Sequence, residues 1–162
     1  MQLHKIYVRH KRVKPGGRLS IPFIKNAVTA SLRLEDVNVP CEVSVLVTDD
    51  VGIRKINREF RGIDEATDVL SFPMHDLTPG KFAVADAAVD PDTGLLLLGD
   101  IIISAERLAA QARGFGHSLV RETTYLTVHS SLHLLGYDHI DEAEGKQLMR
   151  EREEEILRYL FP

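Results

Sequence analysis

Three histidines lie close together in the second half of the chain, at a spacing typical of a metal site. The segment from His129 to His139 has the pattern HxxxHxxGxxH. His129 and His133 are four residues apart, so on an α-helix their imidazoles lie on one face and can chelate one ion. Gly136 can end that helix, and the reversed chain can bring His139 back toward the first two imidazoles. The segment therefore predicts a metal site.

Three nitrogen ligands favour a catalytic zinc site over a structural one. Zinc is usually tetrahedral, and a catalytic site leaves its fourth position to water, whereas a structural site closes with a fourth ligand that is usually cysteine. Nickel or iron can also be held by three imidazoles. A histidine pair at helical spacing often occurs by chance, but the third histidine and the glycine in register favour metal binding.

The residue after the first histidine argues against a protease. Metzincin proteases share the histidine spacing, but they have a glutamate at this position that acts as the general base. Here the residue is Ser130, and a serine hydroxyl cannot hold a proton taken from water near neutral pH. A metzincin-like hydrolase of peptides or small molecules is therefore the weaker alternative.

The composition indicates one soluble domain. With 162 residues, 44% of them hydrophobic and 27% charged, the chain can bury a core as a single domain over residues 1–162. The single cysteine, Cys41, rules out an internal disulfide, agrees with a reducing cytoplasm and favours a role in core packing. We see no signal peptide, and the longest apolar stretch, Leu95 to Ile103, is too short to span a bilayer. We expect a cytoplasmic protein with no membrane partner; the sequence leaves its oligomeric state open.

Charge is distributed unevenly along the chain. Residues 1–34 contain eight basic and no acidic side chains, whereas residues 35–162 contain 12 basic and 24 acidic ones, for a total net charge of −4. Such a basic segment can contact phosphates even in an acidic protein. The alternative is that these charges only solvate the surface.

Hydrophobic periodicity predicts four strands and five helices. The expected strands are residues 3–10, 42–48, 67–72 and 95–104. The expected helices are residues 23–34, a helix capped at 48–50 and stopped by Gly62, residues 104–113, a long helix opened by Ser118, and a last helix with the capping box Asp141 and Glu144. The last two strands have no helix between them, so the sheet cannot be purely parallel. We predict a single α+β domain, a four-stranded mixed sheet packed with about five helices, with the metal site on a helix in the C-terminal half.

Two segments together resemble the YbeY family of metal-dependent endoribonucleases, which act in ribosomal RNA maturation. One is the metal segment, and the other is NREFRGIDEATDVLSFP, from Asn57 to Pro73. The triplet from Gly99 to Ile101 also looks like the following strand of that family. The likeness extends in matching order from Asn57 to His139.

The resemblance implies a function and a set of catalytic residues. It implies zinc ligands at His129, His133 and His139, with Arg61 as a functional arginine near the metal. It further implies a zinc-dependent single-strand endoribonuclease in 16S rRNA 3′-end maturation and ribosome quality control, with ribosomal RNA, ribosomal proteins or assembly factors as partners. A metal-stabilised RNA- or ribosome-binding assembly factor without catalysis is the main alternative.

Arg61 can be interpreted from its chemistry alone in two ways. Its guanidinium can grip a phosphate through two parallel hydrogen bonds and cannot lose its charge. It could equally form a salt bridge to Glu59, Asp64 or Glu65. In the first case the metal would bind the scissile phosphate or activate water while Arg61 neutralises the developing charge; the general base stays unassigned.

Four further residues are expected near the site. Asp138 can orient a ligand histidine from behind. Ser130, where the family usually has a glycine, can crowd the ion or hydrogen bond to its water. Asn57 and Ser71 are expected to line the cleft with Arg61, on the family pattern.

Asp100, His117, Met149 and Tyr137 are expected to be structural. Asp100 lies inside an apolar strand and needs partners if it is buried. His117 is expected to be a surface or capping residue, Met149 to pack in the core, and Tyr137 to pack or to form the turn after Gly136.

Overall fold

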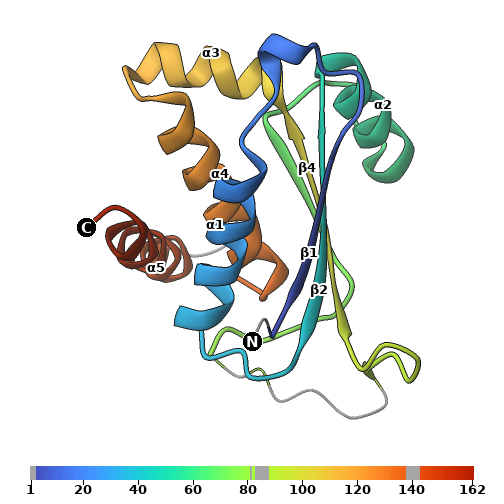
Figure 1. Cartoon of the computed structure of the whole chain (residues 1–162), viewed down its shortest axis with the longest axis vertical. Helices are drawn as coiled ribbons and strands as arrows, with labels where there is room; N and C mark the ends of the chain where they lie inside the picture. The colour runs from blue at the N-terminus through green and yellow to red at the C-terminus, as the bar shows by residue number, and fades with distance from the viewer. Residues whose placement is uncertain (1–2, 81, 83–87, 138–142) are drawn as a thin grey trace.

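A four-stranded mixed sheet with helices on both faces forms the molecule in the computed structural model, which describes residues 3–80, 82, 88–137 and 143–162 (Figure 1). The strand order is β1-β2-β4-β3. The three parallel strands are β1 (Lys5–His10), β2 (Cys41–Thr48) and β4 (Leu96–Ser104), and β3 (Val69–Pro73) runs antiparallel to β4. The predicted mixed sheet is confirmed, and β1 and β3 are its edge strands.

The helices divide unequally between the two faces of the sheet. Along the chain they are α1 (Ile21–Leu34), α2 (Asp50–Arg61), α3 (Ala105–Phe115), α4 (Leu119–Leu134) and α5 (Ala143–Leu160), with a short 3-10 turn at Pro15–Gly17. In Figure 1, α2 lies on one side of the sheet and α1, α3, α4 and α5 on the other. The predicted order of elements and the five helices are confirmed. In the described part of the chain, none of them has the length and apolarity needed to cross a membrane.

The main core lies between the sheet and the helices α1 and α4. In strand β2, successive side chains point to opposite faces of the sheet, and Val43, Val45 and Val47 are buried in this core. Cys41, at the start of β2, is buried there as expected. A second, smaller cluster of Ile53, Leu70 and Ile102 fills the space beneath α2.

The prediction that residues 95–104 are buried on both faces was only partly right. Leu97 and Asp100 of β4 are exposed, because α2 covers only part of its face of the sheet. Asp100 therefore does not need a buried partner.

Helix ends set the positions of the functional side chains. The Asp49 carboxylate accepts a hydrogen bond from the Gly52 N–H (2.8 Å), so α2 begins at the predicted cap. Gly62 ends α2 in the left-handed conformation, φ 70°, which makes Arg61 the last helical residue. Ser118 caps α4 as predicted. The proposed capping residue Asp141 of the last helix lies outside the described residues.

Candidate active site

Helix α4 brings His129 and His133 together, as the spacing predicts. Their Nε2 atoms lie 3.1 Å apart, and the two rings meet edge to face. Two nitrogen ligands at about 2.0–2.1 Å from one tetrahedral zinc ion lie roughly 3.3 Å apart. The separation of the two Nε2 atoms therefore fits two neighbouring positions in a zinc shell.

Glu153 of α5 fixes the orientation of the first histidine. Its carboxylate Oε1 lies 2.9 Å from His129 Nδ1, and its side chain is 10% exposed. An ionised carboxylate can only accept, so it makes Nδ1 the donor of this pair, and a neutral imidazole then has its lone pair on Nε2. A carboxylate behind a ligand imidazole in this way fixes the tautomer and increases the basicity of the ligand nitrogen.

Sequence analysis missed Glu153, although the sequence contains a signal for it. Met149, Glu153 and Ile156 recur at helical spacing on α5, and all three are buried. A carboxylate on an otherwise apolar stripe needs a partner. Burial, followed by the charge of Glu153, raises the pKa of the neighbouring Tyr125 to about 12, which keeps this phenol protonated.

A cleft of about 660 Å³ opens between α4, β3 and the segment after β3, with both histidines on its wall. Strand alternation places Val69, Ser71 and Pro73 of β3 on this wall, while Leu70 and Phe72 pack toward the cluster under α2. The cleft wall also contains Asp68, His75 and Asp76, which sequence analysis did not single out.

Arg61 lines the same cleft as the two histidines. Its Nη2 donates to the carbonyl oxygen of Ser71 (3.0 Å), which is available because β3 is an edge strand. Its guanidinium carbon lies 5.4 Å from the ring centre of Phe72, a cation–π distance. Within the part of the chain that the structure describes, Arg61 forms no salt bridge to Glu59, Asp64 or Glu65, and Asp64 pairs with Arg54 at 2.9 Å instead.

Ser71 lines the cleft as predicted, but Asn57 and Ser130 do not lie on the part of its wall that the structure describes. Asn57 is buried and donates from Nδ2 to the Glu65 carbonyl oxygen (2.9 Å), which holds the loop after α2. Ser130 is 0% exposed, turned into the interior of the protein. Met149 and His117 behave as the structural residues they were expected to be, because Met149 is in the core and His117 contacts Glu122 near the surface.

His139 and Asp138 lie outside the described residues, so the third ligand and the residue before it stay predictions. The chain that leads to them is defined. Gly136 has φ 98°, and its N–H donates to the carbonyl oxygen of His133 (3.1 Å), so it ends the helix region as expected. Tyr137 is buried, and burial together with Glu35 raises its pKa.

The chain is similar to known proteins over most of its length. A family model described as Endoribonuclease YbeY matches residues 17–160. An Endoribonuclease YbeY of Clostridium botulinum strain Langeland is 50% identical over 162 residues, covering 94% of this chain and 96% of that protein. One from Clostridium kluyveri is 48% identical over 141 residues, covering 83% of this chain and 85% of that protein.

Structural comparison supports the fold. The solution structure of TM1509 from Thermotoga maritima matches with a TM-score of 0.56 and 23% identity, covering 93% of this chain and 85% of that chain. The family model and the sequence relatives each span most of the chain. The chain therefore belongs to the YbeY endoribonuclease family.

Proposed function

We propose that this protein is a metal-dependent endoribonuclease that cleaves single-stranded ribosomal RNA and matures the 3′ end of 16S rRNA in the cytoplasm. The observation that carries the proposal is the convergence of two imidazoles, at 3.1 Å between Nε2 atoms, in the cleft that also holds Arg61. The names of the sequence relatives support an RNA substrate. Ribosomal proteins or assembly factors are proposed as further partners in ribosome quality control.

His129, His133 and, from the sequence, His139 would hold one zinc ion, for which nickel or iron are alternatives. A bound zinc supplies positive charge beside a phosphate and lowers the pKa of bound water to about 7. The protein contributes to this chemistry by orienting a ligand, because Glu153 holds the His129 ring with Nε2 toward His133.

Arg61 is suited to bind the phosphate that is cut. One of its five N–H groups is used by Ser71, so others can donate to phosphate oxygens. Stacking on Phe72 and the bond to Ser71 restrict the guanidinium before substrate arrives, which lowers the cost of ordering it. Fixed positive charge where negative charge develops typically contributes 10²- to 10³-fold to the rate.

A recessed cleft favours single strands. The histidines lie on the wall of a hollow between β3 and α4, and an unpaired strand can enter such a hollow more easily than a duplex can. Sequence-specific RNA recognition also mostly uses unpaired segments, because side chains reach the bases of a duplex poorly. Exposed Lys5 and Arg9 on the edge strand β1 offer charge for more distant phosphates.

The test is cleavage of rRNA fragments with single-stranded ends by metal-loaded wild type, His133→Ala and Arg61→Glu, with all cuts mapped. Arg113→Glu is the matched control, because Arg113 is an exposed arginine near the end of α3 that is not part of the cleft. We expect cleavage to fall at least about 100-fold in both site variants and to persist in the control. Equal cleavage by all four proteins would refute the proposal.

The same samples test the noncatalytic alternative. RNA binding without cleavage by metal-loaded wild type would favour an assembly factor whose metal only stabilises the fold. Placing a 2′-deoxynucleotide at the cut site separates two routes, because continued cleavage there eliminates attack by the RNA 2′-hydroxyl.

A further inference from the structure

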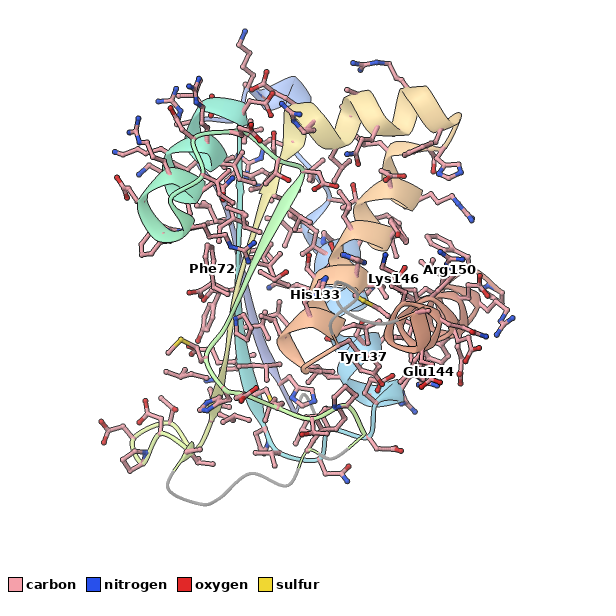
Figure 2. All side chains as sticks on the ribbon, turned by 180° about the vertical axis from the view of Figure 1, so that it is seen from behind. Phe72, His133, Tyr137, Glu144, Lys146 and Arg150 are labelled. Carbon is pink, nitrogen blue, oxygen red and sulfur yellow. The ribbon has the colours of Figure 1, made fainter. Side chains whose placement is uncertain are left out.

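The face of the sheet beside α2 carries a groove of about 810 Å³ that is distinct from the histidine cleft. One row of side chains crosses all four strands on this face. Its members are successive partners in the sheet register, namely Tyr7 of β1, Ser44 of β2, Asp100 of β4 and Phe72 of β3. In Figure 2, Phe72 and His133 lie on opposite sides of the sheet, so the groove and the cleft open on opposite faces.

Two aromatic rings are exposed in this groove. Tyr7 is 52% exposed on the edge strand β1, and Phe60 is 71% exposed on α2. Leu46 and Ile102 add apolar surface between them. Single exposed apolar side chains are common, but a group of them that lines one hollow indicates a binding surface.

The charges around the groove suit a polyanion. Arg9 and Lys25 line it, and exposed Lys5 is on the same face of β1 as Arg9. All three belong to the basic N-terminal segment, whose role the sequence alone left open. Among the described residues of the lining, Asp100 is the acidic one, and a carboxylate can accept a hydrogen bond from the amino group of a base.

Arg61 and Phe72 connect the groove to the cleft around the edge of the sheet. Arg61 lines the cleft, and its guanidinium carbon lies 5.4 Å from the ring centre of Phe72, which lines the groove. Phe60 meets the same ring edge to face, with 5.8 Å between the ring centres. Since β3 is the last strand of the described sheet, a chain that leaves the cleft past Arg61 reaches the groove directly.

We propose that this groove binds unpaired bases of the RNA whose phosphate occupies the histidine cleft, with bases stacked on Tyr7 and Phe60. The inference rests on the proposed function, since it takes the cleft to bind RNA. Single-strand binding sites combine positive charge along the backbone with aromatic rings on which bases stack. Adjacent strands lie about 4.8 Å apart, so the row from Tyr7 to Phe72 spans roughly 14 Å. Other open four-stranded sheets stack about two or three bases on their aromatic residues.

RNA affinity, measured by fluorescence anisotropy, tests the proposal without relying on cleavage. One single-stranded RNA has about four nucleotides and a second has about eight more, within the range that single-strand binding domains cover. The reference protein is the full chain with His133→Ala, so that the RNA stays intact, and every variant is made in this background.

The variants Tyr7→Ala and Phe60→Ala each remove one exposed ring from the groove. Phe115→Ala is the matched control, because Phe115 is 67% exposed on α3 and is outside the described lining of both the groove and the cleft.

We expect the long RNA to bind the reference protein more tightly than the short one does. Its dissociation constant should rise about 5- to 100-fold in Tyr7→Ala and in Phe60→Ala, the effect of removing one stacked ring, and stay within twofold in Phe115→Ala. The short RNA should bind Tyr7→Ala within twofold of the reference, because Tyr7 is at the far side of the sheet from Arg61. Unchanged affinity for the long RNA in folded Tyr7→Ala, or in folded Phe60→Ala should the first variant not fold, would overturn the proposal and leave this face to a protein partner.

A long RNA whose added nucleotides are abasic separates stacking from charge. It keeps the phosphates but has no bases to stack there, so Tyr7→Ala should not weaken its binding. A loss equal to that seen with the normal long RNA would contradict base stacking. Failure of the proposed function would be seen separately, as equal cleavage of RNA by wild type, His133→Ala and Arg61→Glu.

Discussion

Replacing Glu153 tests how much the buried carboxylate behind His129 contributes to metal binding. A hydrogen bond to a charged group contributes about 1.5–3 kcal/mol, and this one is short, at 2.9 Å, with the carboxylate side chain only 10% exposed. At about 1.4 kcal/mol for each factor of ten, Glu153→Ala should weaken zinc binding roughly 10- to 100-fold. That range agrees with the usual effect of removing such a partner.

Zinc affinity at pH 7.5, measured by chelator competition on folded protein, is the assay. Glu153→Gln should give an intermediate loss, because the amide oxygen can still accept from Nδ1 but carries no charge. Glu154→Ala is the matched control, since Glu154 is the adjacent residue and is exposed. If Glu153→Ala bound zinc within twofold of the control, the argument that this carboxylate orients the ligand would be wrong.

Three further predictions concern stability. Gly136→Ala should destabilise the protein by at least about 2 kcal/mol, because φ is 98° and the new Cβ would overlap the Leu77 carbonyl oxygen. Urea unfolding measures this change. The control is Gly114→Ala, which should not destabilise the protein, because Gly114 is a helical residue with open space around it. Burial lowers the pKa of His4, whose Nδ1 accepts a hydrogen bond from the Cys41 N–H. The contribution of His4 to the free energy of unfolding is therefore complete above pH 6.5 and is lost as the pH falls toward the lowered pKa of the folded state. Stability measured across that window should therefore fall less steeply in His4→Asn, and an unchanged slope would argue against this role. Chelation should lower the melting temperature by roughly 5–10 °C relative to protein with zinc at 100 times its dissociation constant, and a melting temperature unaffected by zinc would contradict selective binding to the folded state.

Local patterns predicted the elements well because their causes are local. The alternation of Val43, Val45 and Val47 defines β2, and Asp49, Ser118 and Gly62 mark helix ends in the positions expected of them. The start of β3 was placed two residues too early. Asp68 explains this, because its carboxylate accepts from the N–H of Val69 and turns the chain before the strand begins.

Contacts between distant segments could not be predicted from the sequence. The histidine pair could be predicted since four residues of helix bring its members together, and Ser71 followed from the family pattern. Glu153 is 24 residues from His129, and Glu35 is 102 residues from Tyr137. Their pairing depends on how α1, α4 and α5 pack, which no local pattern specifies.

The environment of Arg61 illustrates the same difference. Its position at the end of α2 follows from Gly62, but its contacts follow from the edge position of β3. The sequence offered three nearby acids as partners, whereas the structure gives it a backbone carbonyl and an aromatic ring. That arrangement leaves its charge directed at the cleft.

The most direct test of the central claim is a zinc titration of RNA cleavage. Metal-free protein would receive increasing zinc while the rate of cleavage of a single-stranded rRNA end is followed, with His133→Ala titrated in parallel. We predict that the wild-type rate rises from near zero and saturates at about one zinc ion per chain, and that His133→Ala stays inactive throughout. A rate that does not depend on zinc, nickel or iron, or an equal response in His133→Ala, would contradict the claim that the histidine cleft is the catalytic site.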